Sequence, residues 1–245
     1  MTDSKGRRHL PLAGAHNIRD IGGYTTQDGQ ATRWRTFLRA DSLHNLSPDS
    51  QKALIDYGLR TIIDLRFSHE LDDEPNVFAQ SDQVNYVNIS LLEEAAPSAP
   101  RRILPNLESM YKFMLDERHT AMKAIFDTML TDGFPVLIHC TVGKDRTGLV
   151  SALMLGLAGV DNQTIAEDYA LTAHYGQDLF AELREKAAAR GRDLDAYEKY
   201  LEAKPEAMLN TLAHLEKHYH DVPTYLQEIG LSQAEVSQLQ QTIRA

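Results

Sequence analysis

The feature that most constrains this fold is a short apolar strand followed by an almost wholly apolar helix. Residues Val136 to His139 are typical of a buried strand, being aliphatic or β-branched up to the final histidine. The stretch from Leu149 to Val160 is apolar apart from Ser151, Gly156 and Gly159, and it is too short to cross a bilayer. A helix that is apolar on every side must be buried. The chain therefore has to enclose this helix in a core beside a sheet.

Strand and helix patterns alternate through the first two thirds of the chain. Ser47-Pro48 marks a helix start and Gly58 its end. The predicted strands are 36–38, 59–65, 85–89 and 136–139, and an amphipathic helix is predicted over 120–130. This order predicts an α/β fold: a central, mostly parallel sheet flanked by helices on both faces, with a C-terminal helical region.

From Asp161 onward the pattern is helical. One apolar stripe carries Met208, Leu212, Leu215 and Tyr219, and Ser232 with Glu235 predicts a capping box. Residues 177–204 form an amphipathic helical excursion whose apolar face must cover something. No repeat or linker is visible, so we expect residues 1–245 to form a single domain, with 177–204 as a lid or insert.

Composition narrows the classes of partner. With 25 Lys and Arg against 35 Asp and Glu, the formal charge of −10 disfavours nucleic acid as a partner. The single cysteine, Cys140, forms no internal disulfide, and the stretch from Met1 to Asn17 has no apolar run of signal-peptide length. We expect a cytoplasmic protein without a transmembrane segment. Secretion by a route without a signal peptide stays open, and the oligomeric state is undetermined.

The stretch His139-Cys140-Thr141-Val142-Gly143-Lys144-Asp145-Arg146-Thr147-Gly148 carries the chemistry. It lies between a buried strand and a helix, where successive amides of a loop curl around an anion and the helix dipole favours negative charge. The same field favours a thiolate at Cys140, and the planar guanidinium of Arg146 can bind two phosphoryl oxygens. This pattern predicts metal-independent phosphoryl transfer through a cysteinyl-phosphate. Thr147 could donate to the departing sulfur, and the two glycines permit the tight loop.

The chain resembles the bacterial tyrosine-phosphatase-like family of cysteine phosphatases, whose signature is HC-x-x-GKDRTG. The likeness extends to residues 17–24, which match N-x-R-D-x-G-G-Y, and to Asp64-Leu65-Arg66 with Glu70 four residues on. It implies a single phosphatase domain with protein-tyrosine phosphatase activity, often with phosphoinositide phosphatase activity as well. The substrates would be phosphorylated proteins or phosphoinositides. The resemblance also links Lys144 with inositol headgroups and likens residues 177–204 to a helical lid.

Two aspartates compete as the general acid for the leaving group. Asp64 ends a predicted strand and should open onto the same crevice as Cys140, whereas Asp145 lies inside the loop. The resemblance favours Asp64, and a structural Asp64 paired with Arg66 is the alternative. We expect residues 141–147 to bind phosphate, His139 to hold the loop backbone, and three residues of the N-terminal segment to support the loop from below: Asn17, Arg19 and Asp20.

Two further hypotheses need a decision. A phospho-binding pseudophosphatase would keep the pocket without turnover, although a binding module has no need of the nucleophile Cys140. His214, His218 and His220 could suggest a metal site, but no acidic or cysteine ligand stands at a persuasive spacing. We expect no metal and no cofactor.

Overall fold

A five-stranded sheet forms the centre of the computed structural model, which describes residues 8–92 and 106–245. Residues 1–7, part of the segment expected to lack a signal peptide, lie outside the described residues, as do residues 93–105. The strands are β1 (Arg19–Asp20), β2 (Phe37–Ala40), β3 (Thr61–Asp64), β4 (Asn85–Asn88) and β5 (Val136–His139), in the order β1-β2-β5-β3-β4. β2, β5, β3 and β4 run parallel and β1 pairs antiparallel with β2 at one edge, which confirms the predicted fold class.

Side chains alternate across the sheet and build two separate cores. Ile63 of β3 and Ile138 of β5 face the larger core, while their neighbours Ile62 and Leu137 face the smaller one. Such alternation follows from the two-residue period of a strand. Because both faces are apolar, helices must cover both of them.

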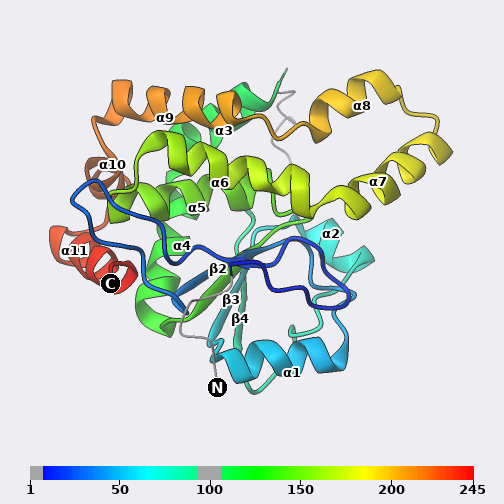
Figure 1. The fold of residues 1–245 in the computed structure, drawn as a ribbon, viewed down its shortest axis with the longest axis horizontal. Coiled ribbons are helices and arrows are strands. Elements are labelled where there is room, and N and C mark those ends of the chain that lie inside the picture. The colour runs from blue at the N-terminus through cyan, green and yellow to red at the C-terminus, as the bar shows by residue number, and fades with distance from the viewer. Residues whose placement is uncertain (1–7, 93–105) are drawn as a thin grey trace.

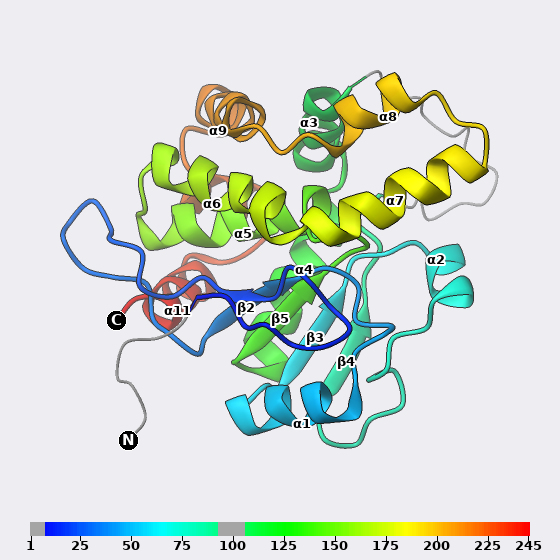
Figure 2. The same cartoon turned by 45° about the vertical axis from the view of Figure 1, so that its right-hand side comes forward.

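Helices alternate with the strands from β2 to β5, and all elements after β5 are helices. The helices are α1 (Pro48–Tyr57), α2 (Ser68–Asp73), α3 (Leu107–Glu117), α4 (His119–Asp132), α5 (Asp145–Ala158), α6 (Asn162–Tyr175), α7 (Gln177–Ala189), α8 (Leu194–Leu201), α9 (Pro205–Tyr219), α10 (Val222–Glu228) and α11 (Gln233–Ile243). Figure 1 shows α1 on one side of the sheet and α5 and α6 on the other. Figure 2 shows α7 and α8 extending beyond the sheet, on the side of α2.

Local sequence signals account for several helix ends. The Ser47 hydroxyl accepts from the Ser50 amide, Pro48 stands at the first helical position, and Gly58 closes α1 in the left-handed conformation. Ser232 and Glu235 form the predicted capping box of α11. The excursion over 177–204 consists of α7 and α8, joined by a short turn.

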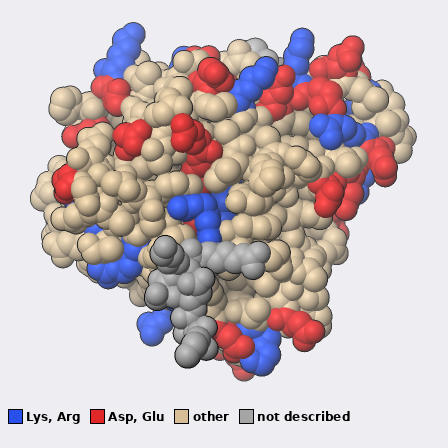
Figure 3. All heavy atoms as spheres, viewed as in Figure 1, with Lys and Arg blue, Asp and Glu red and all other residues tan. Residues whose placement is uncertain are grey.

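The apolar helix predicted over 149–160 is the second half of α5, and α5 is buried at nearly every position. It lies between the sheet and the C-terminal helices, as the first expectation required. Among the described residues, no helix has the length and apolar character that spanning a membrane requires. Acidic and basic side chains are interspersed over the face drawn in Figure 3.

Candidate active site

The strand-to-helix turn places Cys140 at the carboxyl end of β5, directly before a bend that leads into α5. Cys140 is 2% exposed, and α5 begins five residues later at Asp145. The N-cap position, Lys144, supplies no side-chain cap, in contrast with Asp161, which caps α6. The first amides of α5 are therefore left for another acceptor, and the helix dipole favours an anion there.

The 140–143 carbonyl groups are all bound from outside the loop. The Cys140 oxygen lies 3.2 Å from Nδ1 of His139, and the Gly143 oxygen accepts from Arg39 at 2.7 Å. The two carbonyls between them accept from the Ser42 amide at 3.1 Å and from the Asn17 amide group at 3.2 Å. In a trans peptide the N–H points away from the preceding carbonyl. Carbonyls held outward therefore turn the loop amides inward, as an anion nest requires.

At both glycines of the motif, a side chain would come too close to neighbouring atoms. Gly143 has φ +69°, and a Cβ there would lie 2.5 Å from the Ala40 carbonyl oxygen. At Gly148 a Cβ would lie 3.0 Å from the ring of Tyr169, so glycine lets this ring approach the first turn of α5.

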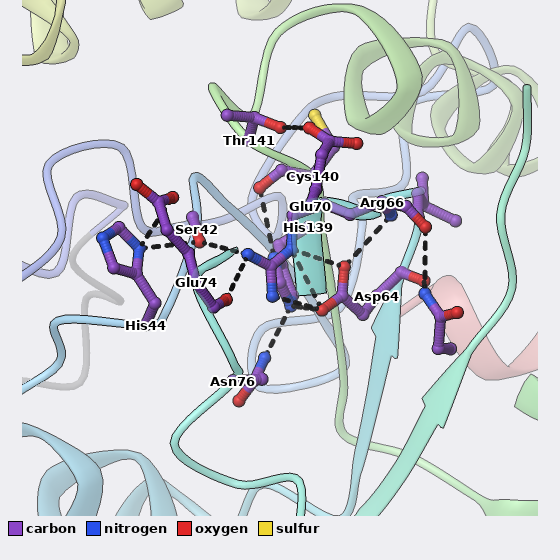
Figure 4. Close-up of polar contacts among 12 residues, drawn as sticks. Ser42, His44, Asp64, Arg66, Glu70, Glu74, Asn76, His139, Cys140 and Thr141 are labelled. Atoms are coloured by element: carbon purple, nitrogen blue, oxygen red, sulfur yellow. Dashed lines mark hydrogen bonds and ion pairs between the residues drawn. The ribbon is translucent and has the colours of Figure 1, made fainter. Parts of the chain in front are cut away.

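Arg146 is held by a carboxylate that the sequence patterns gave no role. Its Nη1 and Nη2 donate to Glu70 of α2 at 2.7 and 3.1 Å, and Nη2 also donates to the Thr141 hydroxyl at 2.9 Å. Thr141 in turn donates to Glu70, a contact drawn in Figure 4. Despite burial, the charge and hydrogen bonds of Arg146 lower the pKa of Glu70 to about 2. The fork therefore stays paired and oriented throughout the neutral pH range.

Charge couples Arg146 to the sulfur. Burial lowers the pKa of Arg146, but the negative charge of Cys140 and the pairing with Glu70 outweigh burial and raise it. The Thr147 hydroxyl is fully buried and has no hydrogen-bond partner among the described residues, so it is free for another acceptor.

Lys144 points toward residues 177–204. Its side chain is 1% exposed, and Nζ donates to the carbonyl oxygens of Tyr200, in the last turn of α8, and, at 3.1 Å, of Glu202, directly after α8. Nζ also lies 3.4 Å from Oδ1 of Asp145 and 5.0 Å from the centre of the Tyr200 ring. The α8 end of residues 177–204 thus rests directly on the loop.

Asp64 is fully buried behind the loop. Both of its oxygens accept from Arg66, whose Nη2 lies 2.8 Å from Oδ2, and the Tyr86 hydroxyl donates to Oδ2 at 2.9 Å. Burial alone would raise the pKa of Asp64, but His139 and Arg66 together lower it to about 2. Burial lowers the pKa of His139, and the charge of Asp64 opposes this lowering. Figure 4 shows Asp64 enclosed by these partners.

This environment does not support the preference for Asp64 as the general acid. A general acid must carry a proton and reach the substrate, and an ionised carboxylate with 0% exposure does neither. The alternative, a structural Asp64 paired with Arg66, matches the geometry. Asp145 is 6% exposed and lies in the loop itself, at the first turn of α5.

His139 links this buried pair to the loop. Its Nε2 lies 2.8 Å from the Asn76 amide nitrogen and 3.3 Å from Oδ2 of Asp64, while Nδ1 faces the Cys140 carbonyl. The ring thus contacts the backbone of Cys140 and is fully buried. It lies where a residue that fixes the loop would lie.

The N-terminal segment supports the loop through Asn17 and Arg19. Asn17 donates to the Val142 carbonyl, and Arg19 donates both to Asn17 and, at 3.3 Å, to the buried Asp168 of α6. Asp168 also pairs with Arg39 at 2.6 Å, and it is Arg39 that holds the Gly143 carbonyl.

Asp20 does not touch the loop, so this part of the expectation is wrong. Its carboxylate accepts from the amides of Gly22 and Arg35 at 2.7 Å each and from the Tyr57 hydroxyl at 2.5 Å. A short carboxylate that caps nearby amides organises the turn that leads into β2.

Among the described residues, no group of three His, Cys, Asp or Glu side chains is placed to hold a metal ion. His214 instead lies 2.9 Å from Asp116 of α3, and its ring is tilted against that of His218, with ring centroids 4.3 Å apart. The contact with Asp116 ties α9 to α3.

Besides Glu70, three residues that contact the loop or its supports were given no role by the sequence patterns. Arg39 and Asp168 form the buried pair behind the loop, and Tyr111 of α3 donates to Asp145 at 2.5 Å. Asp168 shares the buried stripe of α6 with Ile165 and Tyr169, and an acidic residue on an apolar stripe signals a buried ion pair. Tyr111 falls on a helical stripe with Met114 that the strand patterns did not cover.

Comparison with known proteins identifies the family of this chain. A family model described as the tyrosine phosphatase family matches residues 10–245. A tyrosine-protein phosphatase of Nostoc commune is 32% identical over 83% of this chain and 72% of its own. The triple specificity protein phosphatase PtpB of Mycobacterium tuberculosis is 28% identical over 95% of this chain and 97% of its own. A crystal structure of P. aeruginosa TpbA has a TM-score of 0.36 and 14% identity, covering 68% of this chain and 86% of that one. The chain belongs to the tyrosine phosphatase family.

Proposed function

We propose that this phosphatase hydrolyses phosphotyrosine in proteins through a cysteinyl-phosphate intermediate, without a metal. The observation that carries the proposal is the loop whose four carbonyls are held outward between Cys140 and the start of α5. The inward amides would bind the equatorial phosphoryl oxygens, and Arg146 would complete the cradle. The match to the tyrosine phosphatase family supports the substrate class.

The reaction runs in two steps. The Cys140 thiolate attacks phosphorus, the bond to the phenolic oxygen breaks, and a proton from the general acid passes to that oxygen. A water molecule then attacks the phosphocysteine, the P–S bond breaks, and inorganic phosphate leaves. We propose that the buried hydroxyl of Thr147 donates to the departing sulfur, and the absence of a hydrogen-bond partner for it within the described residues supports this role.

We assign the general acid to Asp145. It stands at the loop where the leaving group would emerge, whereas Asp64 is enclosed and ionised. Asp145→Asn should slow hydrolysis of phenyl and alkyl phosphates strongly and that of p-nitrophenyl phosphate little, because p-nitrophenol leaves without protonation. Asp64→Asn should lower kcat on all of these substrates by a similar factor. The reverse pattern would return the role to Asp64.

A phosphate-binding module without turnover is the alternative function. The test is release of phosphate from p-nitrophenyl phosphate in the presence of EDTA, with Cys140→Ser as the matched variant. We expect turnover in EDTA by the wild type and none by the variant, with vanadate still bound by both. Vanadate binding without any turnover by the wild type would establish the binding module.

Phosphoinositide hydrolysis is a second candidate activity, favoured by the second cation of the loop. Lys144 would have to exchange the carbonyl oxygens of Tyr200 and Glu202 for an additional phosphate. Lys144→Ala should then reduce turnover of a phosphoinositide more than turnover of a phosphotyrosine peptide. Equal losses on the two substrates would remove this activity from the proposal.

We further propose that residues 177–204 cover the site as a lid within a single domain. The contact of Lys144 with the carbonyls at the end of α8 supports this placement. Limited proteolysis with and without vanadate tests it, and vanadate should change cleavage within α7 and α8. Identical cleavage patterns would identify the segment as a permanently docked helix pair.

A further inference from the structure

Two buried tyrosines from different helices form a row of hydrogen bonds that ends at Asp145. Tyr111 of α3 donates to Oδ1 of Asp145 at 2.5 Å, and the Tyr111 and Tyr169 hydroxyl oxygens lie 2.7 Å apart. The two rings meet edge to face, with centroids 6.2 Å apart, and their exposures are 0% and 1%. Hydroxyl groups buried this deeply are costly unless each finds a partner. Their arrangement around one carboxylate therefore calls for an explanation.

The direction of donation along these hydrogen bonds is fixed while Asp145 is ionised. A phenol has one hydrogen to donate. While Asp145 is ionised, Tyr111 spends its hydrogen on Oδ1, so Tyr169 must donate to the Tyr111 oxygen. Burial first, and then the charge of Asp145, raise the pKa of Tyr111 well above its ordinary value, so it remains a donor throughout the neutral range.

The two carboxylate oxygens of Asp145 are used unequally. Oδ1 receives Tyr111 and lies 3.4 Å from Nζ of Lys144. Oδ2 takes part in no hydrogen bond or ion pair recorded within residues 8–92 and 106–245. A carboxylate pinned through one oxygen has a fixed plane, and its other oxygen points in a fixed direction.

Resting on the assignment of Asp145 as general acid, we propose that Tyr111, backed by Tyr169, is a positioning residue that pins Oδ1 and presents Oδ2 to the leaving group. The proton passed to the phenolic oxygen is then carried on Oδ2. Gly148 belongs to the same device, because a Cβ at this position would lie 3.0 Å from the ring of Tyr169 and would push the ring back from this turn. The motif's second glycine is thereby connected with the acid as well as with the loop.

The groups that bear on the charge of Asp145 come from every element around it. Lys144 lies on the loop, Tyr111 on α3 and Tyr169 on α6, and the hydroxyl of Tyr200 on α8 interacts with Asp145 through charge. Of these, Tyr111 donates a hydrogen bond directly to the carboxylate. Replacing this donor by an apolar ring should therefore release Oδ1 and leave the orientation of the carboxylate less defined.

The test compares Tyr111→Phe with Asp145→Asn, and with Tyr225→Phe as a matched control. Tyr225 is another fully buried tyrosine of the same core, whose hydroxyl donates to the Leu115 carbonyl at 3.3 Å instead of to Asp145. The substrates are phenyl phosphate, which needs a proton on its leaving group, and p-nitrophenyl phosphate, which does not. Vanadate inhibition reports whether the loop itself is intact.

For Tyr111→Phe we expect kcat on phenyl phosphate to fall about tenfold and kcat on p-nitrophenyl phosphate to change less than about twofold, since the loss concerns only proton transfer. Vanadate inhibition should stay unchanged, because the loop itself is intact. Tyr225→Phe should alter none of these. If Tyr111→Phe does not fold, Tyr169→Phe should show the same pattern with a smaller loss, about threefold.

Two failures can be told apart. If Asp145→Asn loses activity equally on both substrates, the assignment of the acid fails, and the role of Tyr111 fails with it. If Asp145→Asn discriminates between the substrates but Tyr111→Phe does not, only the positioning role is overturned.

Discussion

Replacing Asp168 by asparagine should remove a large part of this protein's stability. The carboxylate is 1% exposed and is bound by Arg39 at 2.6 Å, by Arg19 at 3.3 Å and by the Tyr24 hydroxyl at 2.9 Å. Asparagine keeps the shape but leaves two buried guanidinium groups without a counter-charge. Breaking one partner of a buried ion pair costs about 3–5 kcal/mol, because the remaining charge stays buried.

The pKa of the group gives an independent magnitude. Burial would raise the pKa of Asp168, but Arg19 and Arg39 lower it from its ordinary 3.8 to about 2. At 1.36 kcal/mol per pKa unit, this lowering corresponds to about 2.5 kcal/mol of folding free energy. Because the folded pKa is depressed, this contribution is present above about pH 4 and is lost as the pH falls through about 2.

Urea unfolding at several pH values measures this quantity, followed by far-ultraviolet circular dichroism and by the fluorescence of Trp34, the single tryptophan. With an m value of about 3 kcal/mol/M, a loss of about 3 kcal/mol moves the midpoint down by about 1 M at pH 7. The matched control is Glu167→Gln, the same chemical change at the exposed neighbouring residue, which should cost less than about 0.5 kcal/mol.

The reasoning is refuted if Asp168→Asn costs no more than this control at pH 7. It is also refuted if the difference between wild type and variant does not shrink as the pH is lowered from 5 to 2. Because Arg39 also binds the Gly143 carbonyl, turnover of p-nitrophenyl phosphate should fall together with stability.

Two further substitutions test the loop. Gly143→Ala should cost about 2 kcal/mol or more and abolish most activity, because its φ is +69° and the new Cβ would strike the Ala40 carbonyl. Gly191→Ala, at φ +66° in open space, should cost only about 1 kcal/mol, and equal costs in thermal unfolding would contradict the steric argument. Glu70→Gln should lower kcat/KM for p-nitrophenyl phosphate about tenfold, because Arg146 loses the carboxylate that orients it. Tighter vanadate inhibition with unchanged kcat would show instead that Glu70 competes with phosphate.

Much of the fold follows from local patterns in the sequence. The strand over 136–139 and the helix after Pro48 were predicted within a residue or two, because their apolar periods and caps are local signals. The parallel order of the sheet followed from the alternation of strands and helices. Helix α3, whose buried face carries Tyr111 and Met114, was not predicted.

The site likewise has features that local sequence patterns predict and features that depend on contacts distant along the chain. The position of Cys140 and Arg146 at a strand-to-helix turn could be predicted from local patterns, whereas their chemical roles stay predictions. The choice between Asp64 and Asp145 could not be made, because it depends on burial and on partners distant along the chain. Arg39 directly follows the strand predicted over 36–38. Nothing in the neighbouring sequence indicates that its guanidinium reaches the Gly143 carbonyl, 104 residues away.

The outward anchoring of the loop carbonyls has a consequence for the newly made chain. Two of the anchors come from positions 17 and 39, more than a hundred residues before the loop, and they depend in turn on Asp168, which follows it. Contacts between such remote segments form late in folding, because a long intervening chain must first be ordered. On the ribosome, a chain that has just exposed Cys140 still lacks α6 and hence the charge that neutralises Arg19 and Arg39. The reactive sulfur therefore acquires its amide cradle only after synthesis has passed Asp168.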